Sequence, residues 1–197
     1  MFQKIEEPKY EVLKKEESFE LRKYAPMILA QTEAQGRNTS EASNRGFRKI
    51  ADYIFGSNIP KGSASHGEKI AMTAPVQAKA VRDGSQIAMT APVQASGAGQ
   101  GKWLISFVMP SSFSMETLPT PKNPEVQLIS LPEKWMAVNS FSGFSGDEKV
   151  QEKTNALLEW ISKSGWQVRG ESVLSRYNPP WTLPFFRRNE VAFEVLR

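Results

Sequence analysis

The most regular pattern along the chain is a nine-residue segment, IAMTAPVQA, which occurs at residues 70–78 and again at residues 87–95. In each copy, apolar Ile, Met, Ala and Val alternate with Ala, Thr, Pro and Gln. This period of two predicts a strand with one buried face. The dipeptide Asp83-Gly84 lies between the copies and is typical of hairpin turns. The pattern therefore predicts a hairpin whose two apolar stripes share one face.

The buried face of this hairpin is interpreted first as part of the hydrophobic core, because apolar stripes on strands are usually buried. The small residues and the flexible side chains of Met72 and Met89 also suit one wall of a pocket. The sequence leaves both interpretations open.

Two longer stretches carry apolar residues at helical spacing and predict helices at residues 40–55 and 147–164. The first follows good N-cap residues at positions 38–40 and ends at Gly56. The second begins with a capping box at residues 145–148. Short apolar or alternating segments predict strands at residues 10–14, 19–24, 27–34, 103–109, 126–131, 135–141, 167–175 and 190–196.

The predicted elements follow the same order in two halves of the chain, at about residues 10–109 and 126–197. Each half contains a strand, a helix and two further strands, which is a βαββ unit. We therefore expect one α+β domain over residues 1–197. In it, two pseudo-symmetric βαββ repeats form a distorted antiparallel β-barrel or curved sheet flanked by two helices. Residues 110–124 are rich in proline and are expected to cross the surface without regular structure.

Composition narrows the class of protein. Of the 197 residues, 40% are hydrophobic and 10% aromatic, which is enough for a hydrophobic core. No apolar run approaches the roughly 20 residues that span a bilayer, and residues 1–20 do not resemble a secretory signal.

We expect the chain in the cytoplasm if it is complete. If an N-terminal segment has been removed, we expect it in the periplasm or tethered to a membrane. The oligomeric state stays open.

The inventory of reactive residues excludes several kinds of site. There is no cysteine and only one histidine, so disulfides, thiolate chemistry and the usual zinc sites are excluded. The net charge of +4 mildly favours anionic ligands, but no nucleic-acid-binding motif is present and no nucleic-acid partner is expected. His66 lies in a Gly/Ser loop and is interpreted as a solvated side chain. For Glu190, a buried ion pair that holds the loop at residues 177–189 is favoured over a catalytic role.

The loop at residues 177–189, YNPPWTLPFFRRN, is too rich in proline and aromatic residues for an ordinary connection. Aromatic and basic residues cluster here and on the first predicted helix, namely Tyr177, Trp181, Phe185, Phe186, Arg187 and Arg188 in the loop and Arg45, Phe47 and Arg48 in the helix. Broad aromatic walls with arginine at the rim suit a flat apolar ligand with carboxylate edges. The alternative is that the phenylalanines fill the core while the arginines only stay in water.

Several segments make the chain resemble the SOUL haem-binding protein family. They are YEVLKKEESFELRKYAP (10–26), EASNRGFRKIADYIFGSN (41–58), EKIAMTAPVQ (68–77), FSGFSG (141–146) and YNPPWTLPFFRRNEV (177–191). The resemblance covers nearly the whole chain. It implies two βαββ repeats and non-covalent binding of haem or a related tetrapyrrole in a shallow apolar cleft, for buffering or transport.

In this family the proposed cleft uses the first helix and the loop before the last strand. Mapped onto this chain, the resemblance implies cofactor-binding roles for Asn44, Arg45, Phe47, Arg48, Ala51, Tyr177, Pro180 and Trp181. Basic residues in the family are thought to meet the haem propionates. The axial iron ligand stays open, because Lys23 stands where some members have a histidine. The alternatives are His66, Met72, Met89, a tyrosine or no ligand.

The hypothesis that follows is a non-catalytic tetrapyrrole-binding protein with no catalytic residues. Two alternatives stay open. One is a general small-molecule effector-binding module for which haem is an adventitious guest. The other is a hydrolase or tetrapyrrole-modifying enzyme on the same scaffold, with Glu190 and Tyr177 as the acid–base candidates.

Overall fold

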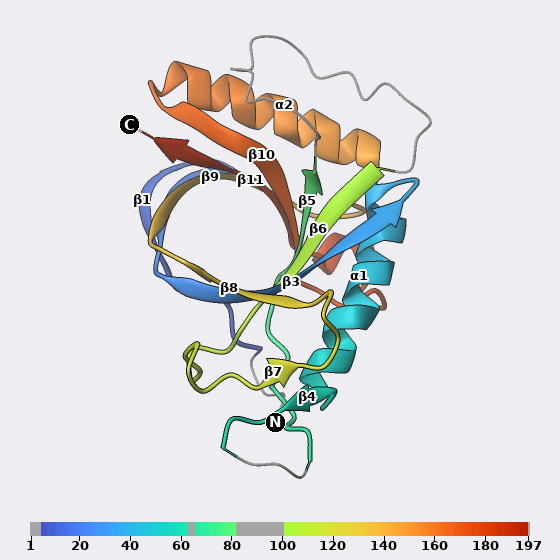
Figure 1. Cartoon of the computed structure of the whole chain (residues 1–197). Helices are drawn as coiled ribbons and strands as arrows, with labels where there is room; N and C mark the ends of the chain where they lie inside the picture. Colours follow the sequence, from blue (N-terminus) through green and yellow to red (C-terminus); the bar gives the residue numbers. More distant parts are fainter. Residues whose placement is uncertain (1–4, 63–65, 82–100, 197) are drawn as a thin grey trace.

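One antiparallel sheet runs through both halves of the chain (Figure 1). The computed structural model describes residues 5–62, 66–81 and 101–196. Within these residues, the strands of the sheet follow the order β1-β2-β9-β11-β10-β5-β6-β3-β8. These strands are β1 (Tyr10–Glu16), β2 (Phe19–Tyr24), β3 (Met27–Gly36), β5 (Val76–Val81), β6 (Gly101–Val108), β8 (Gln127–Leu131), β9 (Lys134–Phe141), β10 (Gln167–Arg176) and β11 (Asn189–Leu196). A separate short pair consists of β4 (Asn58–Ile59) and β7 (Thr120–Pro121), and the helices are α1 (Thr39–Ile54), α2 (Asp147–Lys163) and the 3-10 helix η1 (Pro184–Phe186).

The strand order has an internal symmetry. The first repeat is β3-α1-β5-β6 and the second is β9-α2-β10-β11. In each repeat the first strand pairs with the third, and the third pairs with the second. The repeats meet where β5 pairs with β10, from Lys79↔Val173 to Val76↔Arg176. The predicted α+β fold with two βαββ repeats is therefore confirmed, and both repeats contribute strands to one sheet.

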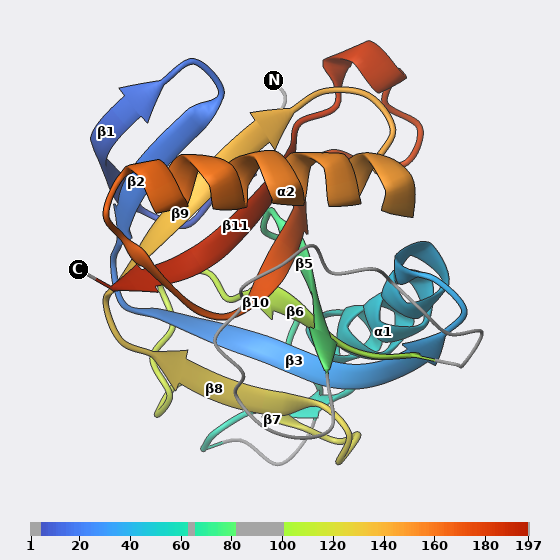
Figure 2. The ribbon, with the colours of Figure 1, turned by 90° about the horizontal axis from the view of Figure 1, so that it is seen from above.

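The sheet is strongly curved, and both long helices cover its convex face (Figures 1 and 2). It does not close into a barrel, since β1 and β8 end the strand order of the described residues without pairing with each other. Side chains alternate along each strand between the two faces. Residues such as Ile105 and Phe107 form a core cluster beneath α1, and Val191 and Phe193 belong to a second cluster beneath α2. No helix in the described part of the chain is both long and apolar enough to cross a membrane.

The first copy of the repeated segment does not form the predicted strand over residues 70–78. Strand β5 covers Val76–Val81 instead and pairs with β6 and β10. Upstream of it, the Ala74 N–H donates to the carbonyl of Glu6 at 2.9 Å, so that part of the segment bonds to the N-terminal region. The second copy, and the turn predicted between the copies, lie outside the described residues.

The capping box predicted for α2 is also wrong. The N-cap of α2 is Gly146, and no side chain caps the helix there. The Ser145 hydroxyl instead accepts a hydrogen bond from Nε of Arg176 at 2.8 Å. The partly buried Arg176 thus bonds to the hydroxyl that the sequence pattern assigned to the helix backbone. The other predicted strands and both helices are present, with ends displaced by only one or two residues.

Helix α1 packs closely on β6 because Gly46 has no side chain. A Cβ atom at this position would lie 2.5 Å from Cβ of Ile105 and closer still to its Cγ1. Ile105 is fully buried and its Cβ belongs to a β-branched side chain with little freedom to move. The helix therefore requires glycine here, although glycine is a poor helix former.

We expect Gly46→Ala to lower the free energy of unfolding by about 1–3 kcal/mol, because the strain of overpacking exceeds the gain in helix propensity. Urea unfolding followed by circular dichroism measures this change. Asp52→Ala, at an exposed position of the same helix, serves as the control and is expected to change stability by less than about 0.5 kcal/mol. A Gly46→Ala protein more stable than the wild type would contradict the close packing.

Candidate functional site

An ion-pair network lies on the concave face of the sheet around Glu190 of β11. Arg22 of β2 donates to both carboxylate oxygens of Glu190, from Nη1 at 2.9 Å and from Nη2 at 3.0 Å. Both side chains are only 3% exposed. Arg22 also donates from Nε to Glu20 at 2.6 Å. The buried ion pair that the sequence favoured for Glu190 is therefore present.

The same carboxylate holds both ends of the loop between β10 and β11. The Tyr177 hydroxyl donates to Oε2 of Glu190 at 2.7 Å, and Arg188 donates from Nε to Oε1 at 3.2 Å. The guanidinium of Arg188 lies 3.6 Å from the centre of the Tyr177 ring and pairs with Glu7 at 2.9 Å. Glu190 thus fixes where the loop leaves the sheet and where it returns.

Burial and charge set the protonation states in this network. Burial lowers the pKa of Arg22, but its hydrogen bonds to Glu190 and its interaction with Tyr24 outweigh burial and raise that pKa above its usual value. Burial, followed by the nearby Glu190 charge, raises the pKa of Tyr177 well above its usual value. Glu190 is therefore surrounded by donors that keep their protons at neutral pH. This arrangement suits a residue that positions the loop.

Large apolar side chains are exposed on the loops that follow β9 and β10. They are Phe144, Trp181, Leu183, Phe185 and Phe186, and we call them the aromatic tip. Trp181 is 83% exposed. Figure 2 shows the β10–β11 loop, in red, projecting from the molecule beside the loop that follows β9. Several exposed large apolar side chains on neighbouring loops are typical of a binding site.

Hydrogen bonds within the loops hold the aromatic tip in shape. The Gly143 N–H donates to the carbonyl of Pro184 at 2.9 Å and joins the two loops. Arg187 donates from Nε to the carbonyl of Thr182 at 2.7 Å, and its guanidinium lies 5.3 Å from the centre of the Phe144 ring. The tip is therefore organised from within, while its apolar side chains stay exposed.

Arg176, the last residue of β10, connects the aromatic tip to α1. Its Nε donates to the Ser145 hydroxyl at 2.8 Å, in the loop that follows β9. Its Nη1 donates to the Ser43 hydroxyl of α1 at 2.9 Å. The N-terminal half of α1 and the loops of the tip therefore meet at this residue.

Three of the described arginines have no acidic partner. Among the described arginines, those paired with a glutamate are Arg22, Arg37, Arg45, Arg169 and Arg188. No carboxylate of the described residues lies within ion-pairing distance of the others, which are Arg48, Arg176 and Arg187. One of these lies on α1, one at the junction and one in the tip. An anionic ligand group would find unneutralised positive charge here.

Four of the residues implied by the family resemblance are exposed and have no ion-pair or ring partner among the described residues. Asn44 and Arg48 are exposed on α1, and Pro180 and Trp181 are exposed in the β10–β11 loop. Of these, Trp181 belongs to the aromatic tip. Their role in haem binding stays a prediction.

The other four implied residues have partners within the protein. Phe47 is half-buried, with its ring centre 5.3 Å from that of Phe107, and Ala51 is buried. Arg45 pairs with Glu41, and Tyr177 belongs to the Glu190 network. These residues lie below or beside the exposed surface. Phe47 packs in the core, which agrees with the alternative interpretation given above for the phenylalanines of the aromatic and basic cluster.

Sequence reasoning missed Phe144, Leu183 and Arg176 as parts of this surface. Phe144 stands alone between glycine and serine residues, without a periodic apolar partner, and that isolation in a turn was the available signal. Arg176 carries no such signal, because its importance depends on Ser43 and Ser145, which come from distant parts of the chain.

The candidate axial ligands lie elsewhere or outside the described residues. His66 is exposed, and its neighbour Gly67 packs against the backbone of Gly56, just after α1. Along a helix that position is about 20 Å from Ser43. Lys23 pairs with Glu133 at 3.0 Å, Met72 is exposed near the N-terminal region, and Met89 is not described. Within the described residues there is no cluster of three or more His, Cys, Asp or Glu that could hold a metal ion.

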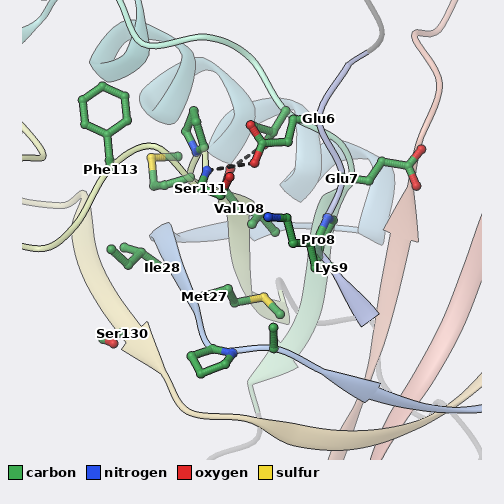
Figure 3. A pocket seen from close by; sticks show the side chains of 15 residues that line it. Glu6, Glu7, Pro8, Lys9, Met27, Ile28, Val108, Ser111, Phe113 and Ser130 are labelled. Carbon is green, nitrogen blue, oxygen red and sulfur yellow. Dashed lines mark hydrogen bonds between the residues drawn. The ribbon is translucent and has the colours of Figure 1, made fainter. Parts of the chain in front are cut away.

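A pocket of about 220 Å³ lies away from these residues, between the N-terminal segment and the ends of β3 and β6 (Figure 3). Its labelled apolar residues are Pro8, Met27, Ile28, Val108 and Phe113. Glu6 closes one side by accepting a hydrogen bond from the Ser111 N–H at 2.8 Å. None of the residues implied by the family resemblance lines this pocket.

Comparison with known sequences identifies related proteins. The model of the family described as SOUL heme-binding protein matches residues 5–194. Heme-binding protein 2 of Homo sapiens is 32% identical over 179 residues, which cover 88% of this chain and 76% of that protein. Heme-binding protein 2 of Mus musculus is 29% identical over 176 residues, with the same coverage of 88% and 76%.

A solved structure shares the fold. The crystal structure of the EcmrR C-terminal domain superposes with a TM-score of 0.62, covering 95% of this chain and 98% of that chain. The two sequences are 12% identical, so the likeness concerns the fold alone. It agrees with the curved antiparallel sheet and two helices described above.

Proposed function

Because this chain belongs to the SOUL heme-binding protein family, we propose that it binds haem non-covalently on the surface formed by the aromatic tip and the N-terminal half of α1. The names of the two Heme-binding protein 2 relatives support haem as the ligand. Buffering or transport of haem is the role that reversible binding at an open surface would serve.

The residues at this surface suit a haem molecule. Haem has broad apolar faces and two carboxylates, and the aromatic tip offers exposed rings beside arginines that lack acidic partners. Trp181 and Phe185 would contact the macrocycle, and arginine side chains without acidic partners would meet its carboxylates. When bound, haem supplies an iron centre. The part of this chain described here binds and orients the macrocycle, with no axial ligand assigned.

The observation that carries this proposal is the exposure of the aromatic tip. Side chains that are more than half exposed contribute little to folding, yet Arg187 and the backbone hydrogen bonds hold their loops in a fixed shape. Covering such a surface with a flat apolar ligand removes apolar area from water, at about 25 cal/mol per Å². Rigid aromatic side chains also lose little conformational entropy on binding.

We expect Trp181→Ala to weaken haemin binding about tenfold, which corresponds to about 1.4 kcal/mol. The stability of the fold should stay within about 0.5 kcal/mol of the wild type, because the side chain is 83% exposed. Titration with haemin, followed by absorbance in the Soret region, measures the affinity. Phe55→Ala is the matched control, since Phe55 is 61% exposed but follows α1 at its opposite end. Equal haemin affinities for both variants and the wild type would overturn the site.

A further inference from the structure

Arg176 carries a positive charge that the described residues do not neutralise. Its partners are all neutral oxygens, namely the Ser43 hydroxyl, the Ser145 hydroxyl and the Ser145 carbonyl. A guanidinium has five N–H donors. These contacts therefore leave one N–H on Nη1 and one on Nη2 without a partner among the described residues.

Two other arginines, one buried and one partly buried, have acidic partners. Arg22 contacts the carboxylates of Glu20 and Glu190, and Arg188 contacts those of Glu7 and Glu190. Arg176 has no such contact, although burial lowers its pKa and only the field of Asp147 opposes that effect. Removing a cation even partly from water without an anionic partner is costly for the folded protein. That cost is removed when an anion binds beside it.

Arg176 also occupies the position where the elements of the proposed site converge. It reaches from β10 to Ser43 on α1 and to Ser145 in the loop that carries Phe144 of the aromatic tip. Among the three arginines without acidic partners, Arg48 is exposed to water, where screening weakens its attraction for an anion. Arg187 faces its own loop, donating to the carbonyl of Thr182. Arg176 is therefore the best placed to bind an anion strongly.

We infer that Arg176 recognises the anionic edge of the ligand, with one carboxylate accepting hydrogen bonds from the remaining N–H groups of Nη1 and Nη2. This inference rests on the proposed function and narrows it. The ligand class becomes a tetrapyrrole with at least one ionised carboxylate, and the ester of the same tetrapyrrole is discriminated against. A charge-assisted hydrogen bond is about twice as strong as a neutral one, which is the source of the discrimination.

The test compares protoporphyrin IX with its dimethyl ester, because both lack iron and differ only in their carboxylates. Porphyrin fluorescence follows each titration in the same mixed aqueous solvent. We expect the wild type to bind the free acid about tenfold more tightly than the ester. In Arg176→Gln this preference should fall to less than about twofold, through weaker binding of the acid and unchanged binding of the ester. Arg176→Lys, which keeps the charge, should retain part of the preference.

Two controls separate recognition from structural support. Arg169→Gln removes an exposed arginine of the same strand that already pairs with Glu194, and it should leave the acid-to-ester ratio unchanged. Ser145→Ala removes one contact of Arg176 but not its charge, and it should also keep the ratio.

If Arg176→Gln weakens acid and ester equally, Arg176 is only a bridge between elements and the inference is overturned. A wild type that binds both porphyrins without preference also overturns it but leaves the proposed function intact, whereas no binding of either overturns both.

Discussion

Replacing Glu190 with glutamine is expected to lower the free energy of unfolding by about 3–5 kcal/mol, the usual result of removing one partner of a buried ion pair. Glutamine keeps the size of the side chain but loses the charge that Arg22 meets with two hydrogen bonds, at 2.9 and 3.0 Å. Because Arg22 is only 3% exposed, water cannot replace the lost partner. Glu20 still contacts Arg22, which places the expected loss nearer the lower end of this range.

Glu194→Gln provides a matched control on the same strand. Glu194 also pairs with an arginine, Arg169, at 3.1 Å, but the two side chains are 32% and 65% exposed. An exposed pair of this kind contributes less than about 1 kcal/mol. Urea unfolding of both variants at neutral pH measures the difference. If Glu190→Gln cost no more than Glu194→Gln, the Glu190 network would not be the structural centre described here.

The double variant Arg22→Met and Glu190→Met distinguishes the cost of an unpaired charge from the value of the pair. Removing both charges leaves no isolated ion, so we expect much of the lost stability to return. The loop between β10 and β11 would still lack its anchor, because Tyr177 and Arg188 both bond to Glu190. Recovered stability together with weak haemin binding would therefore show that Glu190 acts by positioning the aromatic tip.

The sequence predicted most of the fold, because the elements that form it carry local signals. Helix α1 shows its apolar spacing and its N-cap, Asn38, in the sequence itself. Strands such as β2 and β9 have ends that match the alternating segments closely. The repeated order of elements in the two halves was enough to predict two βαββ units, because each unit is built from short-range patterns.

The sequence failed where tertiary partners outweighed local patterns. The first copy of the repeated segment alternates like a strand, yet Ala74 bonds to the N-terminal region and only its last residues join the sheet. Ser145 matched a capping box, but a residue from β10 takes its hydroxyl. The candidate site shows the same division. The proline-rich aromatic loop was visible in the sequence, whereas Arg176 and the pairing of Arg22 with Glu190 depend on contacts between distant segments.

Raising the pH from 10 to 12 is expected to remove about 4 kcal/mol of stability through the two buried tyrosines Tyr24 and Tyr53, and Tyr177, whose pKa is also raised, adds to the loss. Burial raises the pKa of Tyr53 to about 12, with Glu68 adding to the effect. Burial likewise raises the pKa of Tyr24 to about 12, where the Arg22 charge opposes it and the Glu190 charge adds to it. A tyrosine in an unfolded chain has a pKa of about 10. A pKa raised from about 10 to about 12 corresponds to about 2.7 kcal/mol over the whole titration, of which about 2 kcal/mol is lost between pH 10 and 12.

The free energy of unfolding falls with rising pH because each tyrosine holds its proton more tightly in the folded protein than in the unfolded chain. Below pH 10 these tyrosines are protonated in the folded and unfolded chains, so the full stability is present. Between pH 10 and about 12 the unfolded chain loses these protons while the folded protein keeps them, so the free energy of unfolding falls steadily. Urea unfolding at pH 9, 10, 11 and 12 measures the loss. Absorbance at 295 nm should show fewer tyrosinates in the folded than in the unfolded protein at pH 11.

Tyr53→Phe isolates one of these contributions. The Tyr53 hydroxyl donates to the carbonyl of Pro119 at 2.9 Å, so its removal should cost about 1 kcal/mol at neutral pH. Above pH 10, however, the variant should lose stability only about two thirds as steeply as the wild type, because Tyr24 and Tyr177 still hold their protons more tightly in the folded protein than in the unfolded chain. Other titrating groups, such as Lys134, are common to both proteins and cancel in the comparison. Equal slopes for wild type and Tyr53→Phe would mean that the Tyr53 proton is not held by the folded core.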